Sequence, residues 1–193
     1  MKSIYLAGKI GQNDWRHKVT PGLREASAVQ GEAVSNVFHE DEMPDWQNYN
    51  LTTLGTWRYA GPFFSGCDHG CAHDPYGPGH AITGGCIQAA TRGKDWDHST
   101  GYRPWVNRQC RKAIAHCDVF FAWLDDATAY GTLVEIGLAQ GLGKYTVIAT
   151  RDRWARGLGP LDDLWFAFET VDAELYAPTP RLALADLATN GWQ

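Results

Sequence analysis

The chain has 193 residues, a length typical of one domain or of one domain with a large insertion. Its 44% apolar content is enough to fill a core, and its net charge of −5 argues against binding to a nucleic-acid backbone. No run approaches the ~20 apolar residues of a membrane helix, and the chain opens on a strand and a glycine turn rather than on an apolar signal segment. Five cysteines make an odd set for a disulfide framework, so we expect a reducing, cytoplasmic setting.

The first half of the chain predicts two strands, one helix and a long irregular stretch. Residues 2–7 read as a strand that ends in a glycine turn at 8–11, and a helix is expected over about 15–29. Residues 34–38 read as a second strand. Residues 40–103 lack sustained periodicity and are rich in Gly, Pro, Trp, His and Asp, which predicts an irregular insertion or lid.

The second half alternates helices with strands. The expected elements are a helix over 104–116, a strand over 118–124, a helix over 131–142, a strand over 145–149, a last strand over 164–168 and a closing helix over 181–188. Such alternation favours a parallel sheet covered on both faces. The fold class we predict is α/β, a flavodoxin/Rossmann-like open parallel sheet of about five strands with a long irregular insertion.

The stretch 117–144 contains the main candidate for chemistry. Its apolar run ends in Asp125 and Asp126, and a helical pattern opened by Gly131 and Thr132 then carries Glu135 near its start. Open α/β sheets bind ligands at the carboxyl ends of their strands, where a carboxylate on a first helical turn faces the crevice. The helix N-terminus would stabilise Glu135 as an anion, which suits a nucleophile. The alternative is an ordinary surface Glu favoured there by the helix dipole.

Two motifs resemble one known family. Residues 4–8 (IYLAG), together with Asp118 and residues 131–139 (GTLVEIGLA), look like the nucleoside 2-deoxyribosyltransferase family, which includes nucleotide N-glycoside hydrolases. The resemblance covers roughly residues 3–16 and 104–148. It implies a single nucleoside deoxyribosyltransferase-like domain over residues 1–193.

The resemblance also implies a mechanism. In the family, the residue matching Glu135 attacks C1′ and displaces the base, and water or a second base resolves the ribosyl ester. The residue matching Tyr5 holds that nucleophile by a hydrogen bond. These roles agree with an oxocarbenium-like transition state and with a base that must be protonated as it leaves.

Two positions depart from the family pattern. Ala129 stands where transferases carry Asp and some hydrolases carry Ser, and Cys110 stands where the family often has Asp. Asp125, Asp126, Asn107 or a residue of the insertion would then handle the base. Because the transferase Asp is missing, we expect hydrolysis rather than transfer.

The first turn offers a second set of contacts. Backbone N–H groups of Gly8, Lys9 and Ile10 precede a helix and suit a phosphate or a sugar, or form a plain strand–helix turn. Arg16 lies about one turn into that helix. It binds phosphate or is simply solvated, and the sequence favours neither.

The insertion holds an unusual Cys/His pattern, with Cys67, His69, Cys71 and His73 alternating. This spacing suits a lid better than a zinc site, although a metal-stabilised interaction arm stays open. Phe63 and Phe64, like Trp57 and Tyr59, could stack a base, and His69 or His73 could protonate it. The candidate substrate-binding residues are Gly8, Lys9, Ile10, Arg16, Phe63, Phe64, His69, Cys110, Asp126, Gly131 and Thr132, and the candidate catalytic residues are Glu135, Tyr5 and Asp125.

The expected partner is a small nucleoside or nucleotide, with no cofactor, no resident metal, no nucleic acid and no membrane. By analogy with the fold, the chain is expected to form a homodimer or a higher homo-oligomer. The competing function is a non-catalytic module that binds a nucleotide or an ADP-ribose derivative. Elsewhere, Trp165, Phe166 and Phe168 are predicted core residues of the last strand, and Cys117 a small apolar filler.

Overall fold

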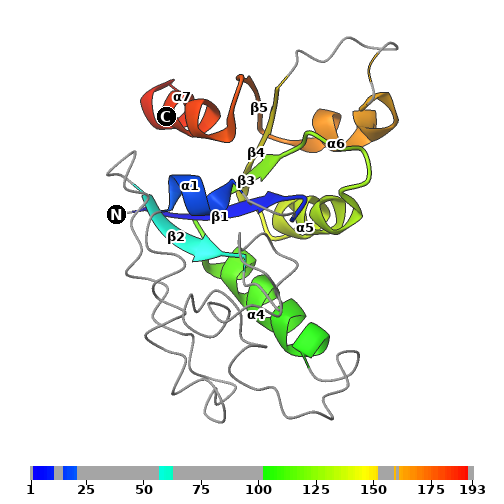
Figure 1. Ribbon diagram of the computed structural model, residues 1–193. Coiled ribbons are helices and arrows are strands. Elements are labelled where there is room, and N and C mark those ends of the chain that lie inside the picture. The colour runs from blue at the N-terminus through cyan, green and yellow to red at the C-terminus, as the bar shows by residue number, and fades with distance from the viewer. Residues whose placement is uncertain are drawn as a thin grey trace, which may run out of the picture.

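The structure is a computed structural model that describes residues 2–10, 15–20, 57–62, 102–151, 159 and 161–190. These residues form an all-parallel sheet of five strands in the order β2-β1-β3-β4-β5 (Figure 1). The strands are β1 (Lys2–Gly8), β2 (Trp57–Gly61), β3 (Val119–Trp123), β4 (Tyr145–Thr150) and β5 (Ala173–Tyr176). The predicted fold class, an open parallel α/β sheet, is confirmed.

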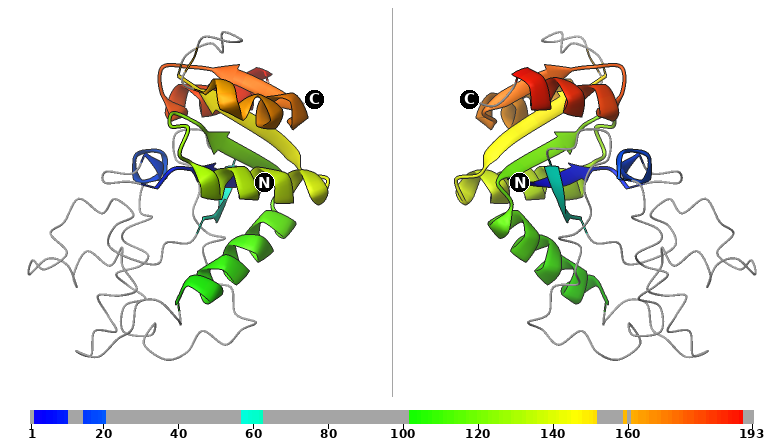
Figure 2. Two further views of the ribbon diagram at one scale, coloured as in Figure 1. Left: turned by 90° about the vertical axis from the view of Figure 1, so that its right-hand side faces the viewer. Right: turned by 90° about the vertical axis from the view of Figure 1, so that its left-hand side faces the viewer.

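Helices cover both faces of this sheet. Figures 1 and 2 show α4, α5 and α6 on one face and α7 on the other, and α5 packs against both α4 and α6. The described helices are α1 (Arg16–Val19), α4 (Tyr102–His116), α5 (Tyr130–Gly141), the 3-10 turn η3 (Asp162–Leu164), α6 (Trp165–Thr170) and α7 (Pro180–Asn190).

The core is built on the central strands. All five residues of β3 are buried, as are Ile4 to Gly8 of β1, because strands covered on both faces must be apolar throughout. In the β1–β3 register Tyr5 lies opposite Phe120, and their rings stack with centroids 5.4 Å apart. This stacking fixes the Tyr5 ring on one face of the sheet.

The strand order creates a switch point between β1 and β3. From β1 the next described strand, β2, lies on one side, whereas β3, β4 and β5 follow on the other. In open α/β sheets, ligands bind beside the carboxyl ends of the strands at such a point. Here those ends are Gly8 and Trp123.

The predicted last strand is wrong. Residues 164–168 belong to η3 and α6, and the final strand is β5 at Ala173–Tyr176. The buried residues Leu161, Leu164 and Phe168 follow a spacing of three and four, which is helical, so an apolar run of five residues was ambiguous. Trp165 and Phe166 are 58% and 66% exposed and do not belong to the core, whereas Phe168 is buried as expected.

The predicted insertion contains one regular element, the edge strand β2, which pairs with β1. Its alternation of buried and half-buried residues is only five residues long, too short to stand out from an irregular stretch. Trp57 and Tyr59 are buried in the core and present no open ring to a base. The predicted strand over 34–38, the predicted helix beyond residue 20 and the rest of the insertion lie outside the described residues.

The other predicted elements agree with the structure to within two residues at each described end, including the closing helix, which runs from Pro180 to Asn190. Within the described ranges, no helix has the length and apolar character needed to cross a bilayer.

Candidate functional site

A tyrosine and a glutamate meet on the sheet face that α4 and α5 cover. The Tyr5 hydroxyl of β1 donates a hydrogen bond to Oε1 of Glu135 on α5, over 2.5 Å. Glu135 lies three residues after the buried Thr132 and four before the buried Ala139, so helical periodicity turns it toward the sheet. The expected contact between the first-strand tyrosine and this acidic residue is therefore present.

The position of Tyr5 depends on a glycine that the sequence did not mark. A Cβ built on Gly61, the last residue of β2, would lie 2.6 Å and 2.8 Å from two ring carbons of Tyr5. Only a residue without a side chain lets the ring lie there. With Phe120 stacked on it, the Tyr5 ring is held by packing rather than by the hydrogen bond alone.

Glu135 lies in the second turn of α5, not in the first turn as expected. The helix begins at Tyr130, so five residues precede Glu135, and the influence of a helix terminus falls off within one turn. Burial instead raises the pKa of Glu135, while the hydrogen bond from Tyr5 and the charge of Arg16 act to lower it. Of the effects that shift the pKa of Glu135, desolvation is the largest, and its place in the second turn weakens the expected stabilisation by the helix N-terminus.

The Tyr5 hydroxyl remains a donor. Burial, followed by the charge of Glu135, raises the pKa of Tyr5 well above its ordinary value. The thiol of Cys110, on α4, is hydrogen-bonded to the same hydroxyl and raises its pKa further. Cys110 thus lies at the site, and both Cys110 and the buried filler Cys117 are reduced.

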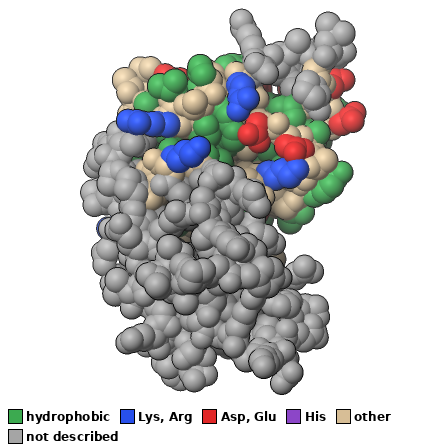
Figure 3. Space-filling model, viewed as in Figure 1, with side chains coloured by type: hydrophobic (Ala, Val, Ile, Leu, Met, Phe, Trp, Pro, Cys, Tyr) green, Lys and Arg blue, Asp and Glu red, His purple; other side chains and the backbone are tan. Residues whose placement is uncertain are grey.

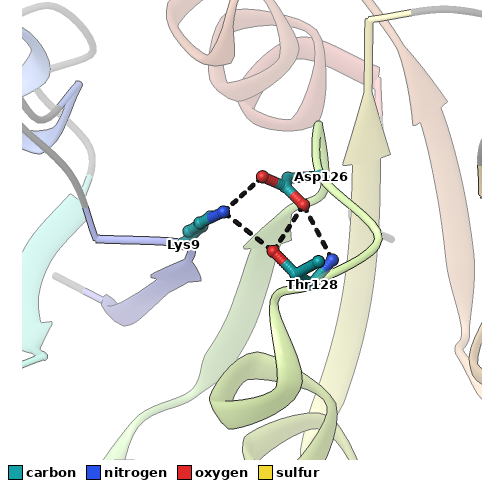
Figure 4. A network of polar contacts seen from close by, with 3 residues as sticks. All are labelled: Lys9, Asp126 and Thr128. Atoms are coloured by element: carbon teal, nitrogen blue, oxygen red, sulfur yellow. Dashed lines mark hydrogen bonds and ion pairs between the residues drawn. The ribbon is translucent and has the colours of Figure 1, made fainter.

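A second polar network lies on the loops that follow β1 and β3 (Figure 4). The Lys9 ammonium contacts the carboxylate of Asp126 and donates to Thr128 Oγ1 over 2.8 Å. The Thr128 backbone N–H and hydroxyl both donate to Asp126 Oδ1 over 2.7 Å. These bonds, that from Lys9 first, hold the pKa of Asp126 far below its usual range, so Asp126 cannot donate a proton to a leaving base.

The helix that follows this network has no side-chain cap. Ala129 occupies the N-cap position of α5 and is buried, and no side chain there accepts a hydrogen bond from the helix. Gly131 is exposed and Thr132 is buried in the first turn. The first N–H groups of a helix lack internal acceptors and favour anions or hydroxyl groups.

The remaining predicted residues are spread around these two networks. Asp125 is exposed on the loop after β3, Asn107 is exposed on α4, and Ile10 is 43% exposed after β1. Arg16 is fully buried, so the solvated alternative for it is wrong. Gly8 ends β1 with φ +146°, and a Cβ there would lie 2.8 Å from the Trp123 carbonyl oxygen.

Three predicted residues, Phe63, Phe64 and His69, lie outside the described residues, as does the whole Cys/His pattern. In the described ranges, no group of three or more His, Cys, Asp or Glu side chains is arranged to hold a metal. Sequence reasoning missed Gly61 and Thr128. The Asp126-x-Thr128 spacing, typical of a turn in which the aspartate accepts the N–H two residues on, was the available signal for Thr128.

Figure 3 shows acidic and basic side chains interspersed over the described part of the face seen there. A comparison with models of known protein families gives no match, and no curated protein matches the chain in sequence. The geometry of Tyr5 and Glu135 is therefore the firmest guide to function.

Proposed function

We propose that the chain cleaves the N-glycosidic bond of a nucleoside or nucleotide, with Glu135 as nucleophile. One observation supports this most directly: Glu135, a half-buried residue, accepts a hydrogen bond of 2.5 Å from the buried Tyr5 hydroxyl beside the β1–β3 switch point. The resemblance of residues 4–8 and 131–139 to deoxyribosyltransferases supports the same assignment.

The first step forms an ester. Tyr5 occupies Oε1, and Oε2 accepts no hydrogen bond from the described residues, so Oε2 is the attacking oxygen. As the Oε2–C1′ bond forms, the C1′–N bond breaks and its electron pair goes to the base, which takes up a proton. The ionised carboxylate also stabilises the oxocarbenium-like transition state.

The second step uses water. Water attacks C1′, the ester bond breaks with its electron pair returning to Glu135, and the water proton leaves to solvent or to a nearby base. Free sugar and base are the products. Ala129 supplies no acidic side chain where transferases carry Asp, which favours water over a second base as the acceptor.

The leaving base needs a proton donor, and Asp125 is our candidate. Asp126 is bound to Lys9 and Thr128 and stays ionised, whereas Asp125 is exposed on the same loop. Backbone N–H groups of the uncapped start of α5 and of the turn at Gly8 to Ile10 would bind sugar hydroxyls or a phosphate.

The protein is incubated with a panel of ribo- and deoxyribonucleosides and their 5′-monophosphates. Chromatography then measures the free base that is released. Mass spectrometry of acid-quenched protein should show an added pentosyl or pentosyl-phosphate group on the peptide that contains Glu135. Glu135→Gln should abolish both signals. Tight nucleotide binding without base release over long incubation would contradict the proposal and favour the non-catalytic binding module.

A matched control exists on the far edge of the sheet. Glu174 of β5 accepts a 2.5 Å hydrogen bond from the Tyr176 hydroxyl, but both side chains are exposed. Glu174→Gln removes the same charge from the same kind of contact and should leave base release unchanged.

A further inference from the structure

Arg16 is a fully buried guanidinium at the first position of α1. Its Nε donates to the carbonyl oxygen of Leu6 over 2.5 Å, and its Nη2 donates to that of Gly8 over 2.8 Å. The guanidinium carbon also lies 4.8 Å from the centre of the Trp15 ring. A charge taken out of water is costly unless it is hydrogen-bonded, and these contacts meet that requirement.

Arg16 makes these contacts beyond the point where β1 stops pairing with β2. The β1–β2 register ends at the pair Tyr5 and Gly61, and Arg16 then meets the carbonyls of Leu6 and Gly8, further along β1. One planar fork can bridge two carbonyls that lie two residues apart, whereas the single nitrogen of lysine cannot hold both in the same geometry. Arg16 thus fixes the backbone of Leu6 to Gly8, the last residues of β1 before Lys9.

The same bond network holds Gly8 in its unusual conformation. Gly8 has φ +146°, and a Cβ built on it would lie 3.3 Å from Nη2 of Arg16. Lys9 follows Gly8 directly, so a fixed Gly8 backbone also limits where the Lys9 side chain can lie. Lys9 is the residue that contacts Asp126 and Thr128 in the network of Figure 4.

We propose that Arg16 is a positioning residue that locks the carboxyl end of β1 through Leu6 and Gly8 and places a buried positive charge beside the strand whose Tyr5 bonds Glu135. The charge of Arg16 lowers the pKa of Glu135, against the burial that raises it. Among the described residues, Tyr5 from β1 and Arg16 from α1 are the charged or titratable groups that act on this carboxyl, and Cys110 from α4 acts on Tyr5 in turn.

Two variants separate charge from geometry. Arg16→Lys keeps the positive charge but loses the two-pronged contact, and Arg16→Gln keeps a hydrogen-bond donor but loses the charge. Arg111→Gln, which removes an exposed arginine from α4, is the matched control. The probe is the carboxyl carbon resonance of 13C-labelled Glu135, titrated with pH in protein without substrate and assigned by its loss in Glu135→Gln.

In Arg16→Gln the Glu135 midpoint should move to higher pH, whereas Arg16→Lys should stay near the wild type and Arg111→Gln should not move. Both Arg16 variants should lower the melting temperature, because two carbonyls of β1 lose their shared donor. A Glu135 midpoint unchanged in Arg16→Gln would overturn the charge role. If Arg16→Gln does not fold, Arg16→Lys still decides: a melting temperature equal to wild type would overturn the locking role.

This inference rests on the proposed function only for its kinetic consequence. If the chain releases base, the acid limb of kcat/KM in Arg16→Gln should move with the titration, by about tenfold in rate for each pH unit of displacement. The titration requires no substrate, so it can succeed when base release fails, and base release can succeed when the titration shows no effect.

Discussion

Two tyrosine–glutamate pairs among the described residues are joined by hydrogen bonds of the same length in different surroundings. Tyr5 and Glu135 meet on the covered face of the central strand β1, and Tyr176 and Glu174 meet on the exposed edge strand β5. In the first pair, burial raises the pKa of both groups and Arg16 acts on the carboxylate, whereas both side chains of the second pair are exposed to solvent. A short hydrogen bond between tyrosine and glutamate therefore does not by itself indicate a catalytic site. The surroundings of the pair determine whether its carboxylate can act as a nucleophile.

Neutralising both carboxylates tests the difference between the two pairs most strongly. Glu135→Gln should reduce base release by about 10³-fold or more, since it removes the nucleophile. Glu174→Gln should retain wild-type kcat/KM, measured by chromatography of released base. Equal losses in the two variants would mean that the environment of Glu135 has no special role.

Removing the two hydroxyls tests the donors. Tyr5→Phe should lower kcat/KM by about 10- to 100-fold, as expected when a hydrogen bond to a charged group is lost. Because that bond lowers the pKa of Glu135, its loss should move the acid limb of the pH–rate profile to higher pH. Tyr176→Phe should leave the whole profile in place, and a Tyr5→Phe profile that shifts to lower pH would contradict the assignment.

The packing that holds Tyr5 can be tested without touching either polar group. Gly61→Ala should destabilise the fold by about 1–3 kcal/mol, because the new Cβ overlaps the Tyr5 ring, and should lower kcat/KM as well. Gly137→Ala on α5 is the control: a Cβ there meets nothing within 4 Å, and alanine favours the helix by about 0.5–1 kcal/mol. Urea denaturation gives both values, and an unchanged Gly61→Ala would show that the Tyr5 ring can move.

The smallest expected effect is a gain of stability. The folded-state pKa of Glu135 is raised, so its contribution to stability is present below the unfolded-state pKa and is lost as pH rises through the folded-state value. Glu135→Gln carries no such penalty and should be more stable than wild type at neutral pH, by about 1 kcal/mol, with the advantage shrinking toward acid pH. Thermal melting at several pH values measures it, and an advantage that grows toward acid pH would contradict the sign.

The strands with long apolar runs and the helices with clear periodicity were predictable from sequence. The run from Val119 to Leu124, ended by two aspartates, favoured a doubly covered strand, and the pattern around Ile136 and Ala139 favoured a helix. Short elements were not predictable: β2 has five residues, and the apolar segment around Phe166 suited a strand as well as the helix that forms.

The residues of the candidate site were also only partly predictable from the sequence. The motif residues identified Tyr5 and Glu135 as a pair, and the prediction that they meet was correct. Nothing local marked Arg16 as buried, because an arginine after Trp15 in a polar stretch is ordinarily a solvated residue. Its burial depends on the carbonyls of Leu6 and Gly8 in β1, which lie beyond the last residue pair of β1 and β2.

The α/β class, the central strands and the acidic residue beside the switch point could be predicted from the sequence, because these depend on residue type and on local periodicity. The desolvation of that residue and the positions of Arg16 and Gly61 depend on the folded structure. Desolvation and close packing depend on which distant segments come together, and the chain encodes that only through the complete fold.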